Sequence, residues 1–136
     1  MADSKPRSLF TKLIVDDEEK MAEYYSEVYG LQVVVRVAGD GDGLGEPFRE
    51  VILGTSASME GETLVMFKFT ARCKPRDQQV ILGFVTDDIE ALRERIVVNG
   101  GALVGELKDM PEHGVRVQFA TDPEGALTEN VQLLAG

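Results

Sequence analysis

The sequence contains an internal repeat, which restricts the fold more than any other feature. When its 136 residues are shifted by 71 positions, acidic and glycine positions in the first half coincide with those in the second. Between positions 10 and 34 the identical pairs are Asp16 and Asp87, Asp17 and Asp88, Glu19 and Glu90, Glu23 and Glu94, Gly30 and Gly101, and Val33 and Val104. A repeat of this kind indicates one structural unit used twice. We therefore expect module one at about residues 8–69, a linker at 70–79 and module two at about 80–134.

Each copy has the pattern of a strand, a helix and three further strands. A short apolar run opens each copy, LFTKLIV in the first and VILGFV in the second, and such runs are typical of strands. A capping Asp with Glu three residues later predicts the helix start, and a glycine predicts its end. These residues are Asp16, Glu19 and Gly30 in the first copy, and Asp87, Glu90 and Gly101 in the second. One small helix covers only one face of a sheet, so we expect the two units to work together.

The charge balance restricts the partners. The chain has 14 Lys and Arg against 24 Asp and Glu, a net charge of −10. This charge disfavours nucleic acid and anionic membranes and favours a small cationic ligand. No segment is long and apolar enough to span a membrane, and the first residues lack the apolar stretch of a secretory signal. The single cysteine, Cys73, excludes an internal disulfide, so we expect a cytoplasmic protein.

Three segments carry a resemblance to a known family. They are VDDEEKMAEYYSEVYGL at residues 15–31, TDDIEALRERIVVNGG at 86–101 and DPEGALTE at 122–129. With the duplicated βαβββ unit, they resemble the vicinal oxygen chelate superfamily, the group of glyoxalases, bleomycin-resistance proteins and extradiol dioxygenases. The resemblance implies an α+β fold and a single domain over residues 1–136. Its tandem βαβββ modules would form an open, curled mixed β-sheet around a cavity, with helices outside, within a homodimer.

The resemblance also implies where a metal would bind. Enzymes of this family hold a divalent metal with a His or Gln from the first strand of each module and a Glu from the last strand of each. The matching positions here are Phe10, Ile81, Val65 and Glu129. Only Glu129 keeps the family's ligand type, and one carboxylate does not make a metal site. We therefore expect no metal and no other cofactor, with a divalent metal as the alternative if other residues supply the ligands.

Alternation along the strands predicts the cavity lining. The expected ligand-binding residues are Phe10, Lys12, Ile81, Gly83, Met66, Phe67 and Glu129. Two of these residues, Lys12 and Glu129, are also candidate catalytic groups, and His113, in a loop before a strand, is a third. Each has a structural alternative: Lys12 paired with an acid such as Glu129, Glu129 in a salt bridge, and His113 as an exposed loop residue.

Two arginines complete the candidates. Arg49 and Arg116 open equivalent strands in the two copies. They would bind an anion or, on the simpler interpretation, remain solvated strand residues.

Three functions follow from these observations. The first is a metal-free protein that binds a small hydrophobic or cationic molecule, for sequestration of an antibiotic or toxic metabolite. The second is a glyoxalase-like or dioxygenase-like enzyme, a lyase or isomerase. It would use metal ligands outside the family positions, or work without metal through Lys12, Glu129 or His113. The third is a structural subunit without a ligand. We adopt the first, because the expected cavity is largely apolar with few charges.

Overall fold

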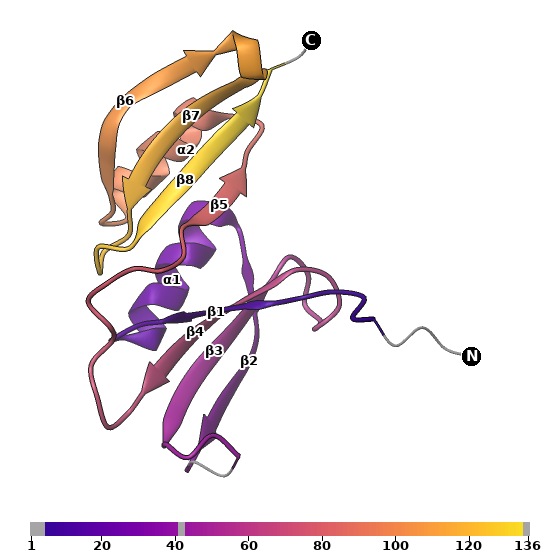
Figure 1. The fold of residues 1–136 in the computed structure, drawn as a ribbon, viewed down its shortest axis with the longest axis vertical. Coiled ribbons are helices and arrows are strands. Elements are labelled where there is room, and N and C mark those ends of the chain that lie inside the picture. The colour runs from indigo at the N-terminus through magenta and orange to yellow at the C-terminus, as the bar shows by residue number, and fades with distance from the viewer. Residues whose placement is uncertain (1–4, 41–42, 135–136) are drawn as a thin grey trace. The chain divides into compact units, whose positions relative to one another are not determined.

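The computed structural model describes residues 5–40 and 43–134. Its elements follow the repeat and form two four-stranded sheets (Figure 1). The first copy contains β1 (Thr11–Ile14), α1 (Glu18–Tyr29), β2 (Gln32–Gly39), β3 (Phe48–Gly54) and β4 (Thr63–Phe69). The second contains β5 (Leu82–Val85), α2 (Ile89–Val98), β6 (Ala102–Met110), the 3-10 turn η1 (Pro111–His113), β7 (Val115–Thr121) and β8 (Leu127–Leu133). The predicted α+β fold with tandem βαβββ modules is confirmed.

The chain divides into two compact units, residues 1–22 with 30–74 and residues 23–29 with 75–136. The sheet orders are β1-β4-β3-β2 and β5-β8-β7-β6, and neither sheet closes. In each sheet the first pair is parallel and the others are antiparallel. The parallel pair has the same register in both copies, because Lys12 lies opposite Val65 and Gly83 opposite Glu129. The repeat therefore extends to the pairing of individual residues.

The helix starts lie one residue later than the sequence predicted. The Asp17 side chain accepts a hydrogen bond from the Lys20 amide at 3.0 Å, and Asp88 caps α2 by accepting one from the Ala91 amide at 3.1 Å. A side-chain cap bonds an amide two or three positions along, so each cap directly precedes its helix. The second Asp of each acidic pair is thus the cap, in place of Asp16 and Asp87.

The two helix ends differ. Gly30 follows α1 with φ +74°, the left-handed conformation expected at a helix end. After α2 this conformation falls on Gly100, with φ +97°, because Asn99 occupies the preceding cap position. Gly101 therefore has another role: a Cβ there would lie 2.6 Å from Tyr24 Oη and 2.7 Å from the Thr121 carbonyl oxygen.

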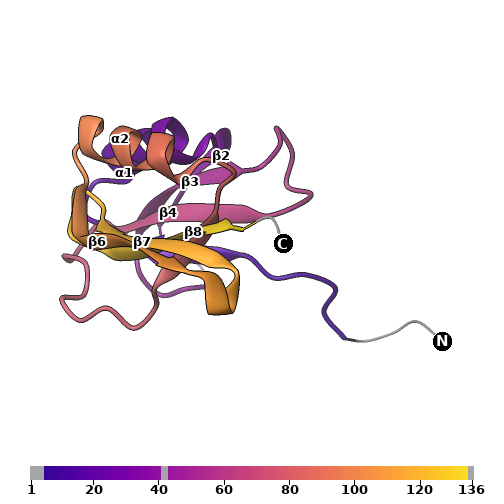
Figure 2. The ribbon, with the colours of Figure 1, turned by 90° about the horizontal axis from the view of Figure 1, so that it is seen from above.

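Both helices make contacts with strand residues. The first turn of α1 reaches the first sheet through ion pairs of Glu18 with Arg49 and of Glu19 with Arg36. α2 lies over one face of the second sheet (Figure 2). In the described part of the chain, neither helix is long and apolar enough to cross a membrane.

Candidate functional site

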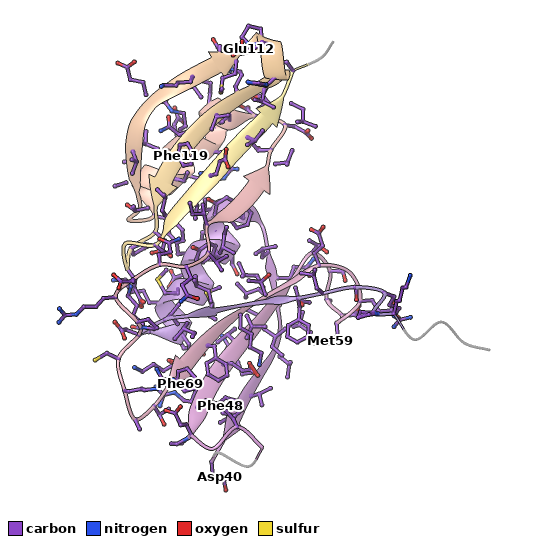
Figure 3. All side chains as sticks on the ribbon, viewed as in Figure 1. Asp40, Phe48, Met59, Phe69, Glu112 and Phe119 are labelled. Carbon is purple, nitrogen blue, oxygen red and sulfur yellow. The ribbon has the colours of Figure 1, made fainter. Side chains whose placement is uncertain are left out.

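One face of the first sheet gathers aromatic rings around an ion pair. The register places Phe48 opposite Phe69 and Glu50 opposite Phe67, so their side chains share a face. Lys12 belongs to this face because it lies opposite Val65, two residues before Phe67. We call this surface, defined by Lys12, Phe48, Glu50, Phe67 and Phe69, the Lys12 face; Figure 3 labels Phe48 and Phe69 on it.

The ion pair joins a buried carboxylate to a half-exposed ammonium. Lys12 Nζ donates hydrogen bonds to both Glu50 carboxylate oxygens, at 3.0 and 3.3 Å. Glu50 is 7% exposed, whereas 41% of the Lys12 side chain is exposed. The same ammonium lies 4.9 Å from the centre of the Phe67 ring. The acid that neutralises Lys12 in this unit is therefore Glu50, where the sequence had suggested an acid such as Glu129.

The rings on this face contact one another. Phe48 stacks on Phe67 with centroids 4.9 Å apart, and Phe69 meets Phe67 edge to face at 4.9 Å. The Arg72 guanidinium carbon lies 3.7 Å from the centre of the Phe69 ring, and Glu46 accepts a 2.7 Å hydrogen bond from Arg72 Nε. One of the protein's own cations lies over the Phe67 ring and another lies over the Phe69 ring. Phe67 and Phe69 are 5% and 8% exposed and belong to the buried apolar cluster of this unit, so a ligand reaches these rings only where it displaces one of the two cations.

The second unit presents a different face around Glu129. Glu129 lies opposite Gly83 on one side and Phe119 on the other, so the three residues share a face. Phe119 is 37% exposed, and Ile81, directly before β5, is 53% exposed. This face is apolar and open to solvent, with one carboxylate at its centre.

The remaining predicted residues are dispersed. Phe10 directly precedes β1 and is 60% exposed. Met66 is fully buried on the face opposite to Phe67, so only Phe67 of this pair belongs to the Lys12 face. His113 ends η1 on an exposed turn.

The two arginines make ion pairs. Arg49 Nε donates to Glu18 at 2.6 Å. Arg116 donates to Asp109 at 2.7 Å and to Glu90 at 3.2 Å. These contacts neutralise both guanidinium groups, so neither arginine is a ready anion site. The Arg49 side chain is still 57% exposed, whereas that of Arg116 is 25% exposed.

The family's metal does not fit the residues present. Phe10, Ile81 and Val65 have no donor atoms in their side chains, and Glu129 alone supplies oxygens. Within residues 5–40 and 43–134, no cluster of three or more His, Cys, Asp or Glu side chains has the geometry to hold a metal ion. We therefore derive no step through a metal.

The sequence analysis missed a buried polar layer on the helix side of the second sheet. Tyr25 Oη donates to the Asp122 carboxylate at 2.8 Å, and Tyr29 Oη donates to the Asn130 side-chain oxygen at 2.7 Å. Burial raises the pKa of Tyr25 far above its ordinary value and that of Tyr29 to about 12. Gln118 and Asn130 are fully buried. The sequence signal that could have predicted their burial was their alternation with apolar residues in VRVQFAT and LTENVQL. Because these groups are hydrogen-bonded, the layer is structural.

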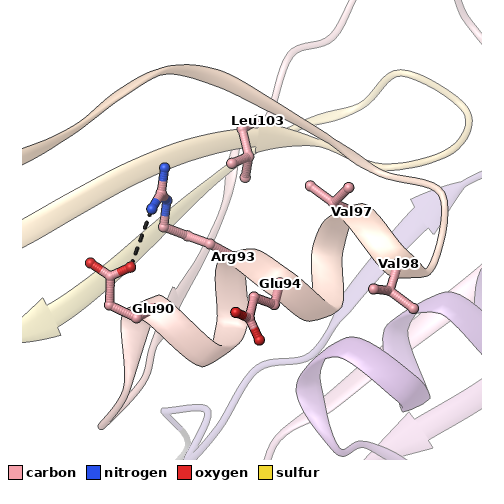
Figure 4. Close-up of a pocket in the computed structure, with 6 residues that line it drawn as sticks. All are labelled: Glu90, Arg93, Glu94, Val97, Val98 and Leu103. Carbon is pink, nitrogen blue, oxygen red and sulfur yellow. Dashed lines mark hydrogen bonds and ion pairs between the residues drawn. The ribbon is translucent and has the colours of Figure 1, made fainter.

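A shallow pocket of about 420 Å³ lies along α2 of the second unit (Figure 4). It is lined by Glu90, Arg93, Glu94, Val97, Val98 and Leu103. The Arg93 guanidinium is already engaged, because it donates to Glu90 at 3.3 Å and to Gln118 at 3.0 Å. None of the residues predicted from the sequence to bind a ligand lines this pocket.

Comparison with known proteins adds a family and a fold. A family model described as Glyoxalase/Bleomycin resistance protein/Dioxygenase superfamily matches residues 7–129. A glyoxalase family protein from Bacillus cereus is similar in structure, with a TM-score of 0.81 and 19% identity over 99% of each chain.

Two named enzymes are also similar. Glyoxalase I from Zea mays has a TM-score of 0.77 and 21% identity; the match covers 95% of this chain but 45% of the maize chain. The trypanothione-dependent glyoxalase I from Leishmania major has a TM-score of 0.72 and 19% identity, over 94% of this chain and 87% of the other. No curated protein matches the sequence. At these identities the structural likeness shows a shared fold.

Proposed function

Because the chain belongs to the glyoxalase, bleomycin resistance protein and dioxygenase superfamily, we propose that it is a metal-independent protein that binds and sequesters a small apolar molecule. Its role would be that of a resistance protein, with an antibiotic or toxic metabolite as the ligand. The observation that carries this proposal is that Phe10, Val65 and Ile81 have no donor side chains in a chain that carries the Lys12 face.

The Lys12 face has the chemistry of a small-molecule site. Such sites combine apolar and aromatic surface with a few placed polar groups. Here Phe67 is in contact with both neighbouring rings, and Lys12 and Glu50 supply the charged groups. A flat ligand would bury its surface against the rings, which favours binding by about 25 cal/mol for each Å² of apolar area removed from water.

Catalysis has less support from these residues. Lys12 Nζ donates hydrogen bonds to both Glu50 carboxylate oxygens, so this amine is engaged with an acid of the protein and is not directed at a substrate. His113 lies on an exposed turn, where water competes with any proton transfer. Sequestration requires only the complementary surface.

We also propose that the protein is cytoplasmic and homodimeric. β1 and β2 each pair with one strand, so both edges of the first sheet offer unpaired backbone groups. Light scattering on the eluted protein would test the assembly, and a particle with the mass of one chain would contradict it.

The function can be tested with metal analysis and a neutral aromatic probe. We expect purified protein to contain far less than one metal ion per chain. 1-Naphthalenemethanol should raise the melting temperature equally with and without EDTA, since a ligand that binds only the folded state stabilises it. Phe67→Leu should weaken this binding about tenfold, from the loss of ring stacking. Phe84→Leu, a ring-to-leucine change in the second unit, should not weaken it.

Two results would contradict the proposal. One is a tightly bound metal at about one ion per chain. The other is stabilisation by aromatic compounds only after metal is added.

A further inference from the structure

The Glu50 carboxylate is a buried negative charge with a replaceable partner. Its residue is 7% exposed, and among the described residues its carboxylate accepts hydrogen bonds from Lys12 Nζ alone. A buried charge is costly unless it is paired, so an ionised Glu50 requires a cation at this position. The cation need not belong to the protein.

The Lys12 ammonium can be hydrated once another cation takes its place beside Glu50. Lys12 lies on β1, which pairs only with β4 and so forms an edge of the sheet. Of its side chain, 41% is exposed, and a lysine ammonium on a flexible four-carbon stem is readily hydrated. A rotation about the stem would return Nζ to water and uncover the Glu50 carboxylate and the Phe67 ring together.

The rings beside Glu50 already bind cations. Lys12 Nζ lies over Phe67 at 4.9 Å, and the Arg72 guanidinium lies over Phe69 at 3.7 Å. Attraction between a cation and a ring face strengthens when water is excluded. Phe67 is 5% exposed, so a ligand that displaces the Lys12 ammonium would meet this ring in a largely dry environment.

The charge of the site decides between a cationic and an anionic ligand. An anion binding to Lys12 would draw the ammonium from Glu50 and place a second negative charge beside a buried carboxylate. A cation would satisfy Glu50 while Lys12 is solvated. The net charge of −10 also attracts cations at long range.

From these contacts we propose that the Lys12 face binds a compact organic cation, an ammonium, amidinium or guanidinium group on an apolar body, which replaces the Lys12 ammonium between Glu50 and the Phe67 ring. This inference rests on the proposed small-molecule-binding function and specifies the class of ligand. In the absence of ligand the Lys12 ammonium occupies the site, and it therefore competes with the ligand for Glu50.

The test uses three probes that differ mainly in charge: 1-naphthylmethylammonium, 1-naphthalenemethanol and 1-naphthoate. Calorimetric titration of the full-length protein should show the cation binding about ten to a hundred times more tightly than the neutral alcohol, the range expected for a hydrogen bond to a charged group. The anion should bind more weakly than the alcohol.

Two substitutions assign the preference to this ion pair. Glu50→Gln keeps the side-chain shape, and it should remove the preference for the cation while leaving binding of the alcohol. Lys12→Met removes the competitor and should strengthen cation binding. The matched control is Lys20→Met, which removes the same charge from an exposed position on α1 and should change the affinities little.

Lys12→Met leaves Glu50 without its partner and could impair folding, so a second variant is needed to test the inference. The double variant Lys12→Met/Glu50→Gln has no buried charge at this position, and it should bind the alcohol with no preference for the cation. If the cation preference persists in Glu50→Gln or in the double variant, the inference is wrong.

The remaining outcomes separate the inference from the proposed function. Equal affinity for all three probes, or a preference for naphthoate that Lys12→Met abolishes, would overturn the cation class while the binding function stands. Failure of every probe to bind the wild-type protein and all variants would overturn both.

Discussion

The first sheet buries apolar side chains on the side that carries Arg49, whereas the second sheet buries polar ones on the side that faces α2. In the first unit, Val51 and Met66 are fully buried there, and the charged pair of Lys12 and Glu50 lies on the opposite face. In the second unit, Gln118 and Asn130 are fully buried on the helix side. The two copies therefore share strand register but differ in which side chains they bury on the equivalent faces.

This difference shows which properties the duplication preserves. Backbone pairing depends on strand length and turn geometry, which both copies retain, as the equivalent pairs Lys12–Val65 and Gly83–Glu129 show. Side-chain chemistry depends on individual residues and has diverged. A site in one unit therefore cannot be inferred from the other, and equivalent substitutions in the two units are informative.

The largest expected difference in stability between equivalent substitutions in the two units is at the turn before the last strand of each unit. The Asp122 carboxylate accepts hydrogen bonds from Tyr25 Oη and from the amides of Glu124 and Ala126, all at 2.8–2.9 Å. Asp122→Ala leaves these donors without their partner and should lower the free energy of unfolding by about 3 kcal/mol. Denaturant titration followed by circular dichroism measures the change.

The equivalent residue in the first unit supplies the control. Ser58 Oγ accepts from the Glu60 amide at 3.3 Å, the same contact in the corresponding turn, but at an exposed position. Ser58→Ala should cost less than about 0.5 kcal/mol. Equal losses at the two positions would show that burial of the carboxylate does not distinguish the turns.

A smaller contrast is expected at the glycines that follow the helices. Gly101→Ala places a methyl group against Tyr24 and the Thr121 carbonyl, which should cost about 2 kcal/mol of stability from overpacking. Gly30→Ala meets no atom within 4 Å, so its cost of about 1 kcal/mol comes from the left-handed backbone alone. Melting temperatures of the two variants would rank them, and a larger loss for Gly30→Ala would contradict the assigned roles.

The sequence predicted features that depend on local pattern. The repeat, the four strands of each unit and the placement of Gly83 and Glu129 on one face were predicted from spacing and alternation. The Lys12–Glu50 pair was not predicted, because it depends on β1 and β3 both pairing with β4, which brings together residues 38 positions apart. The hydrogen bonds of Tyr25 and Tyr29 were missed for the same reason, since their partners lie about 100 positions away.

The smallest expected difference in stability concerns the ion pairs at the helix starts, where the sequences of the two units differ in one residue. Glu18 is 6% exposed and pairs with Arg49, and its repeat equivalent is the fully buried Ile89. The equivalent arginine, Arg116, pairs instead with Glu90, whose side chain is 59% exposed. The hydrogen bond from Arg49 holds the pKa of Glu18 below its ordinary value of 4.5. The folded state therefore favours the ionised carboxylate of Glu18.

This shift sets the sign of a pH effect. A lowered pKa in the folded state contributes stability above the ordinary pKa, and that contribution disappears as the pH falls through the folded value. Glu18→Gln should thus cost about 1 kcal/mol at pH 7, reduced because Arg49 is half exposed, and progressively less below pH 4.5. Glu90→Gln should cost under about 0.5 kcal/mol. Unfolding free energies measured from neutral to acidic pH test both, and a Glu18→Gln deficit that persists at low pH would show that packing, and not charge, makes Glu18 stabilising.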